Sequence, residues 1–249
     1  MQEAINEWLI MDEANMKFHM GQYENPYRST VKFVDFLQEK LQSTRANRIC
    51  DLGCGAGAVL DYMLKHDNKI FAEGYGIDIS ADIVEIGNKI LVERNTNNCK
   101  LEVGDIFHLD KKMVEKFDGV ISLQTFNILP DYRGIAEVMC SLKPSWIAFS
   151  TLGFEGMIDY NIKLYDYTKE KDGNHAEVFY NIYSLPLMQK YFEDLGYKNF
   201  SYREFEMDID LPQINKLGRG TYTIKTESGK RMQISGAMMM PWYFCFVSK

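Results

Sequence analysis

The segment Arg48–Met63, with the sequence RICDLGCGAGAVLDYM, constrains the fold more than any other feature of the chain. A short apolar run that contains Ile49 and Leu52 leads into glycines at 53, 55 and 57, and a helix-like run follows. Glycines allow a sharp turn after a strand and leave backbone N–H groups free at the start of the next helix. The pattern therefore predicts a strand, a tight turn and a helix that hold a nucleotide-like cofactor.

The middle of the chain repeats this alternation of strand and helix. Helix-like runs with a helical spacing of apolar residues are predicted at 56–67, 81–95 and 132–144. Apolar strands are predicted at 48–53, 71–80, 99–106, 117–124 and 145–152. Strands and helices in this order predict an α/β fold with a parallel sheet covered by helices on both faces.

Segments on either side of this core extend the prediction. Two helices are expected at 2–17 and 29–41, and residues 1–45 are assigned to an N-terminal helical lid. Residues 46–249 are assigned to one domain, with insertions at about 153–184 and 211–240 that overhang the carboxyl edge of the sheet. The domain is expected to end with a helix at 185–197, a strand at 199–210, a hairpin at 220–236 and an apolar strand at 238–249.

Polar side chains follow the second, third and fourth predicted strands. Asp78 lies at the end of the second strand, 25 residues after Gly53, Asp105 at the end of the third, and Gln124 at the tip of the fourth. Parallel strands end on one edge of the sheet, where such folds bind ligands and where a carboxylate can accept hydrogen bonds from ribose. Asp78 can equally cap the helix that starts near residue 81, and the two roles are compatible.

The motifs DLGCGAG, GIDIS, GDIF and FDGVISL, in that order, resemble those of class I S-adenosylmethionine-dependent methyltransferases over Ile49–Leu152. The resemblance implies a Rossmann-like, seven-stranded and mostly parallel sheet whose last strand is antiparallel. It also implies S-adenosylmethionine as cofactor and S-adenosylhomocysteine as product. Asp51 and the glycines Gly53, Gly55 and Gly57 would line the methionine part of the cofactor, and Gln124 would lie near the sulfonium and the acceptor.

The same resemblance assigns the adenosine part of the cofactor to the next two strand ends. Asp78 would bind the ribose, and Ile79 would pack on the adenine. Asp105 would accept a hydrogen bond from the adenine amino group, with Ile106 against the ring.

Residues of the N-terminal lid are candidates for both binding and catalysis. Arg28 is a candidate for the cofactor carboxylate, since a guanidinium binds carboxylates with two parallel hydrogen bonds, and Tyr27 is a candidate for contact with the cofactor. His19, in the lid, His108, just after Asp105, and Tyr27 are the candidate catalytic groups. No motif identifies the general base.

Two alternatives stay open at this point. Tyr165 and Lys169 are four residues apart, the spacing of the catalytic pair of NAD(P)-dependent short-chain oxidoreductases, and Gly53–Ala58 can be read as a G-x-G-x-x-A dinucleotide pattern. The glycine loop of that family is wider and lies nearer the N-terminus. A non-catalytic, methyltransferase-like binding subunit would carry the same cofactor motifs.

Net charge and composition limit the classes of partner that the chain is expected to bind. Acidic residues outnumber basic ones by 35 to 28, which argues against a nucleic acid or a membrane surface as partner. No apolar run approaches the roughly 18 residues that span a bilayer, and the first residues lack the basic region of a signal peptide. Five cysteines without metal-ligand spacing predict reduced thiols and no metal site, so we expect a cytoplasmic protein.

The acceptor is expected to be a small molecule. The tyrosine-rich insertions resemble those of bacterial small-molecule methyltransferases, some of which modify sugars or surface-polysaccharide precursors. The sequence does not distinguish methylation of oxygen, nitrogen or carbon. The Thr221–Ser235 hairpin offers an edge to a second copy of the chain, so a homodimer is one of the assemblies open to it.

Overall fold

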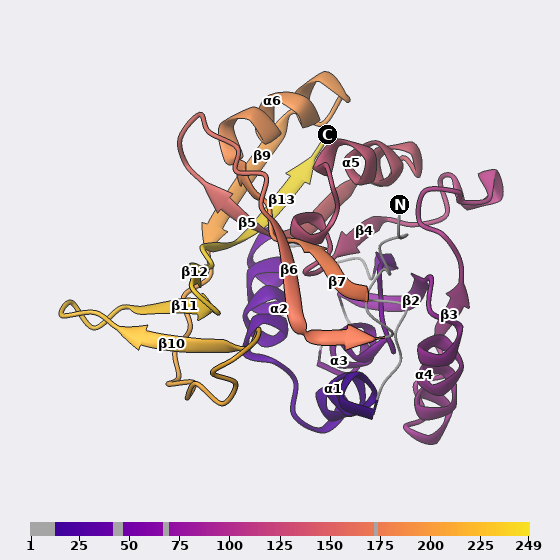
Figure 1. The fold of residues 1–249 in the computed structure, drawn as a ribbon. Helices are drawn as coiled ribbons and strands as arrows, with labels where there is room; N and C mark the ends of the chain where they lie inside the picture. The colour runs from indigo at the N-terminus through magenta and orange to yellow at the C-terminus, as the bar shows by residue number, and fades with distance from the viewer. Residues whose placement is uncertain (1–12, 42–46, 67–69, 172–173) are drawn as a thin grey trace.

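An eight-stranded mixed sheet forms the centre of the protein, and seven of its strands follow the order β3-β2-β1-β4-β5-β13-β9 (Figure 1). The computed structural model describes residues 13–41, 47–66, 70–171 and 174–249. β13 runs antiparallel to both neighbours and the other pairs are parallel. The eighth strand, β8 (Ile182–Ser184), pairs in parallel with the end of β5. The strands of the path are β1 (Asn47–Leu52), β2 (Phe71–Asp78), β3 (Cys99–Val103), β4 (Gly119–Ser122), β5 (Trp146–Phe154), β9 (Asn199–Glu204) and β13 (Trp242–Ser248). The predicted fold class is confirmed.

Helices cover both faces of this sheet, as Figure 1 shows. β1 explains why, because its side chains alternate: Ile49 joins the apolar cluster of one layer, whereas Cys50 and Leu52 join that of the other. The first layer holds α2 (Arg28–Leu41), α3 (Ala58–His66) and α4 (Ala81–Glu93), and the second holds α5 (Tyr132–Ser141) and α6 (Leu185–Asp194). The short helices η2 (Lys111–Met113) and η3 (Phe126–Ile128) lie in the connections on either side of β4.

Helix α1 (Glu13–Glu24) corrects the prediction for the N-terminal segment. The sequence predicted a helix over 2–17 and a loop from 18 onwards, whereas the helix continues to Glu24, and residues 1–12 lie outside the described part. Gly21 lies inside the helix. It is exposed, and a Cβ there would meet no atom of the described residues within 4 Å, so one unpacked glycine costs too little to end the helix.

Two small sheets are added to the core. β6 (Lys163–Lys171) and β7 (Asn174–Phe179) form an antiparallel hairpin within the tyrosine-rich stretch, to which the sequence assigned no strands. β10 (Thr221–Lys225) and β11 (Arg231–Ser235) form the predicted hairpin, and β12 (Met238–Met239) pairs with β11. Figure 1 shows β10 and β11 projecting from the side of the molecule at which β9 and β13 lie.

None of the helices in the described residues is both long and apolar enough to cross a membrane.

Candidate functional site

The turn after β1 adopts the conformation that its glycines predict. Gly53 and Gly55 have positive φ angles of 79° and 53°, which other residues rarely adopt. The N–H groups of Gly53 and Cys54 both donate to the carbonyl oxygen of Ile77 on β2, at 2.8 and 3.1 Å. These bonds hold the loop against the end of β2, beside Asp78.

Asp78 joins the glycine loop to the start of α4. One carboxylate oxygen accepts a hydrogen bond from the N–H of Gly55 at 2.8 Å, and the other accepts one from the N–H of Ser80 at 3.0 Å. Ser80, not Asp78, is the N-cap residue of α4, so Asp78 holds the segment just before the helix and does not cap it as the sequence allowed. Asp78 also braces the loop on which the cofactor was predicted to sit, while its contact with a ribose stays a prediction.

Asp51, at the end of β1, is a buried acid with an incomplete set of partners. Its side chain is only 2% exposed, and one carboxylate oxygen has no hydrogen-bond partner in the part of the chain that the structure describes. Burial, reinforced by the neighbouring charge of Asp78, raises the pKa of Asp51 to about 8. Such a group gains a partner, and becomes ionised more readily, when a cationic ligand comes within reach of it.

Asp105 lies at the end of β3, next to an exposed apolar surface. Its carboxylate accepts hydrogen bonds from the N–H of Phe107 at 2.9 Å and from Nδ1 of His108 at 2.6 Å. The Phe107 N–H contributes most to lowering the pKa of Asp105, and His108 adds to it. Ile79, Val103 and Phe107 leave 44–50% of their surface exposed near the ends of β2 and β3. An apolar surface beside a carboxylate suits a flat ring that carries an amino group; Ile106 is half-buried in the core beneath α5.

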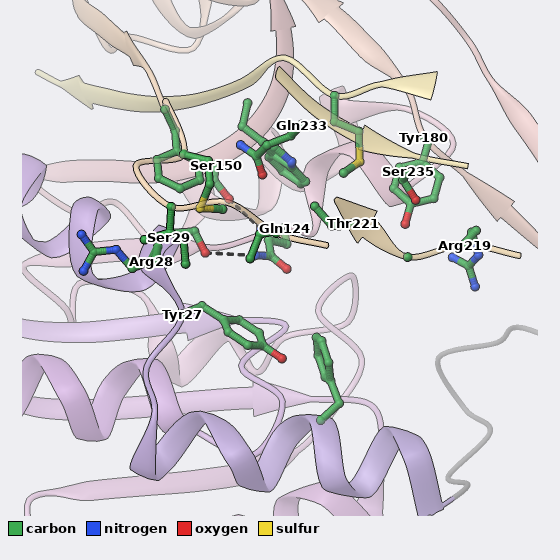
Figure 2. A pocket seen from close by; sticks show the side chains of 18 of the residues that line it. Tyr27, Arg28, Ser29, Gln124, Ser150, Tyr180, Arg219, Thr221, Gln233 and Ser235 are labelled. Atoms are coloured by element: carbon green, nitrogen blue, oxygen red, sulfur yellow. Dashed lines mark hydrogen bonds between the residues drawn. The ribbon is translucent and has the colours of Figure 1, made fainter. Parts of the chain in front are cut away.

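Gln124 follows β4 in a backbone conformation that non-glycine residues rarely adopt, with a φ of 59°. Its backbone N–H donates to Oγ of Ser150 at 2.8 Å, and its side-chain Nε2 lies 3.4 Å from Oγ of Ser29. Strained residues of this kind persist where the surroundings hold them, and they gather at functional sites. Here the strain turns the Gln124 side chain into a cavity (Figure 2).

The lid residues lie against the glycine loop. A Cβ added to Gly55 would lie 2.9 Å from Nδ1 of His19, so the imidazole packs directly on that glycine, and Tyr23 donates a hydrogen bond to the carbonyl oxygen of Ala56. Burial lowers the pKa of His19, and the nearby charge of Asp78 partly opposes the effect. The part of α1 that the sequence predicted as a loop thus contacts the glycine loop.

Tyr27 and Arg28, the other candidates of the N-terminal segment, have different surroundings. Tyr27 lines the cavity, and burial raises its pKa to about 12. The Nε of Arg28 donates to Asp208 at 2.8 Å, and the guanidinium points away from Gln124 in Figure 2. This ion pair leaves the expected contact between Arg28 and a cofactor carboxylate without geometric support.

The cavity has a volume of about 650 Å³ and lies beside the tips of β4 and β5. His19, Tyr27, Arg28 and Gln124 line it, whereas Asp51, Asp78, Asp105 and His108 do not. The sequence-predicted residues therefore form two groups, one that lines the cavity and one at the ends of the strands outside it. Gln124 and His19 are the cavity residues that lie beside the second group. Six aromatic side chains line the cavity: Phe18, Tyr27, Tyr180, Phe205, Trp242 and Phe244.

Several lining residues were not predicted from the sequence. Ser150 lies inside β5, Gln233 lies inside β11, and Asp166 of β6 forms an ion pair with Arg219, with 3.2 Å between Nε and the carboxylate. Nothing in their sequence context separates them from ordinary strand and loop residues. Their role becomes visible only when the added sheets fold over the edge of the core.

Comparisons with known proteins identify the core. A family model described as "Methyltransferase domain" matches residues 43–154. The curated protein "Uncharacterized RNA methyltransferase" of Clostridium tetani is 22% identical over 118 residues, which are 46% of this chain and 25% of that protein. The chain thus spans about a quarter of the length of this curated relative.

Solved structures agree on the fold. One chain from a complex of the Haloferax volcanii Trm112 methyltransferase activator with a methyltransferase matches with a TM-score of 0.59 and 16% identity, over 95% of this chain and 94% of that one. Magnesium protoporphyrin IX methyltransferase from Synechocystis PCC 6803, solved with bound S-adenosylmethionine, matches with a TM-score of 0.52 and 15% identity, over 96% and 86%.

The domain match sets the oxidoreductase alternative aside, since it covers the glycine loop and the strand ends on which that alternative also depended. Of the pair that suggested it, Tyr165 is exposed on β6, and the side chain of Lys169 lies outside the described residues. Three observations agree on a methyltransferase core: the order of the motifs, the sheet topology and the family model. Residues 43–154 therefore match a methyltransferase domain, and they contribute the parallel strands of a Rossmann-like sheet.

Proposed function

We propose that this enzyme transfers the methyl group of S-adenosylmethionine to a small-molecule acceptor bound in the cavity beside Gln124. The proposal rests on the position of Gln124, which lies between the methyltransferase domain and the cavity. Gln124 follows a strand of the methyltransferase domain, and its side chain lines a cavity closed by segments outside that domain. A molecule in this cavity would lie next to the strand ends at which the cofactor is expected.

The residues at the strand ends suit the groups of S-adenosylmethionine. The unpartnered oxygen of Asp51 suits a cationic group, and the cofactor carries an ammonium and a sulfonium. Asp78 would hold the ribose and Asp105 the adenine amino group, with Ile79 and Ile106 against the ring. When bound, the cofactor supplies an electrophilic methyl group, so the protein mainly has to align the acceptor and exclude water.

His19 is the proposed general base. It lines the cavity and packs on the glycine loop, and its lowered pKa keeps the imidazole neutral and able to accept a proton at neutral pH. The Tyr27 hydroxyl, with a pKa of about 12, is suited to donating a hydrogen bond to the acceptor. His108 is 81% exposed and bound to Asp105, so we assign it to the cofactor side.

Sugars and surface-polysaccharide precursors fall within the proposed class of acceptor, whether oxygen, nitrogen or carbon receives the methyl group. RNA is the second candidate, because the name of the Clostridium tetani relative includes it. The net charge of −7 weighs against RNA. A cytoplasmic location and a homodimer formed through the β10–β11 hairpin stay predictions.

The direct test is release of S-adenosylhomocysteine from S-adenosylmethionine with a panel of small acceptors. With a hydroxyl or amine acceptor, His19→Ala should lower kcat by about 100-fold, the usual contribution of a general base. His66→Ala is the matched control, since His66 is an exposed residue at the end of α3, stacked on Tyr62, and should change little. Turnover that is unchanged in His19→Ala would remove His19 as the base, and no turnover with any acceptor, despite cofactor binding, would favour a non-catalytic subunit.

A further inference from the structure

The walls of the cavity are largely apolar. The six aromatic side chains come from the lid, the β6–β7 region, the segment after β9 and the closing strand β13. Met207, Ile209 and Met240 lie between them. Such a wall favours a ligand with flat or ring-shaped apolar surface, because aromatic rings contribute the largest apolar contact area of all side chains.

A few polar groups on these walls lack partners within the protein. Gln233 is only 6% exposed and lines the cavity, yet its side-chain amide makes no hydrogen bond with any described residue; its backbone carbonyl is used by Met240. Across the same described residues, neither the Gln124 amide oxygen nor the Tyr27 hydroxyl has a partner. Figure 2 shows Gln233 above and Tyr27 below Gln124. Gln233 is buried, Tyr27 is half-buried and Gln124 is exposed in the cavity wall, so these groups offer hydrogen bonds to a ligand that enters the cavity.

The charges on the walls are balanced. The Arg28 guanidinium donates to Asp208, and Arg219 pairs with Asp166, whose side chains are 16% and 5% exposed. His19 is neutral at neutral pH because burial lowers its pKa. Each cation among the described lining residues thus already faces a carboxylate. An anion that enters the cavity would lose its hydration and would find no unpaired cation to interact with, so its binding would be unfavourable.

From these observations we propose that the acceptor is an uncharged, ring-bearing molecule with a hydroxyl, carbonyl or amide group. Phosphorylated and carboxylated acceptors are excluded, so the class proposed above is narrowed to those sugars and precursors that carry no phosphate. The inference rests on the proposed function, since it takes the cavity as the acceptor site. Amide side chains both donate and accept, so Gln124 and Gln233 suit neutral polar groups at two positions on one ligand.

Two dyes with the same skeleton test the charge preference. N-phenylnaphthylamine is neutral, and anilinonaphthalene sulfonate carries one additional sulfonate; both fluoresce strongly only in apolar surroundings. Each is titrated into the full chain with saturating S-adenosylhomocysteine. We expect the neutral dye to bind one site per chain at least about tenfold more tightly, because burying an unpaired anion is costly. Energy transfer from tryptophan to the dye should fall in Trp242→Phe, in which Trp8 and Trp146 remain as donors, because Trp242 lines the cavity.

A matched pair of variants tests the physical reason. Asp208→Asn removes the carboxylate that faces Arg28, so binding of the sulfonate dye should tighten about fivefold while that of the neutral dye stays the same. Asp210→Asn is the control. It removes one acid two residues away, from an exposed pair with Arg231, a residue that does not line the cavity. It should change binding of neither dye.

Three results would overturn the inference: equal or tighter binding of the sulfonate dye to the unmodified chain, no binding of either dye, or an equal response of the two variants. The proposed function fails by a different measurement. If calorimetry shows no binding of S-adenosylhomocysteine or S-adenosylmethionine, the methyl-transfer proposal is wrong, while the dye preference still reports on the cavity.

Discussion

Asp51 illustrates how one residue can couple cofactor binding to pH. Its pKa is raised to about 8 in the folded protein, against 3.8 for an ordinary aspartate, so between these values the folded state holds a proton that the unfolded chain has released. Stability from this group is therefore fully present below pH 4 and is lost as the pH rises through 8. A cationic ligand reverses the preference of the folded protein for protonated Asp51, because the cation stabilises the ionised carboxylate.

The affinity for S-adenosylhomocysteine, whose ammonium is the cation, should therefore rise with pH up to about 8 and then level off. A single linked proton changes the affinity by at most about tenfold per pH unit. Calorimetry in buffers with different ionisation enthalpies should show proton release on binding at neutral pH. Asp51→Asn should bind more weakly and with little pH dependence; a wild-type affinity that is flat between pH 6 and 8 would contradict the assignment.

Asp78 makes a second prediction at the scale of one residue. Asp78→Ala removes the acceptor of the Gly55 N–H as well as the proposed partner of the ribose. Charge-assisted hydrogen bonds of this kind contribute about 1.5–3 kcal/mol, so affinity for S-adenosylhomocysteine should fall about 10- to 100-fold. The control is Asp82→Ala, which removes an exposed acid from the first turn of α4. Unchanged affinity in Asp78→Ala would remove Asp78 from the site.

Among the elements, α4 packs unusually closely on the glycine loop. A Cβ added to Gly87 would lie 2.3 Å from the carbonyl oxygen of Ala56 and 2.6 Å from Leu101. These are backbone and buried core atoms that have little room to move. The glycine therefore has a packing role in a helix where alanine would otherwise be preferred.

Gly87→Ala should accordingly destabilise the protein by about 1–3 kcal/mol, the usual cost of overpacking a core. Gly21→Ala is the matched control in α1. No atom of the described residues lies within 4 Å of the added Cβ, so the higher helix propensity of alanine should stabilise the protein by about 0.5–1 kcal/mol. Urea unfolding of both variants measures the difference, and equal stability of the two would contradict this account of α4.

The whole molecule carries a net charge of −7, which bears on the choice between RNA and a small acceptor. RNA binding depends on cations that neutralise phosphates and therefore weakens with salt. On the described surface many basic residues are already paired with acids, as Lys230 is with Glu204 and Arg203 with Glu39. A polyanion would have to compete with these pairs.

We therefore expect no saturable binding of a short single-stranded RNA at micromolar protein, even at low salt, in fluorescence polarisation. The same preparation should bind S-adenosylhomocysteine, which serves as the positive control for folding. Tight RNA binding that falls steeply with salt would instead favour RNA as the acceptor.

Local sequence was sufficient for the core. The spacing of the glycines and the apolar strands predict the sheet and its helices. The polar residues at the ends of successive strands predict where Asp51, Asp78, Asp105 and Gln124 lie. These features are predictable because they depend on short-range geometry and on the common direction of parallel strands. Only the tertiary structure decided the cavity in which we propose that the acceptor binds. The pairing of Arg28 with Asp208, the contact of His19 with Gly55 and the position of Gln233 join residues far apart in the chain. Such contacts depend on how separate segments pack, and they leave no periodic pattern in the sequence.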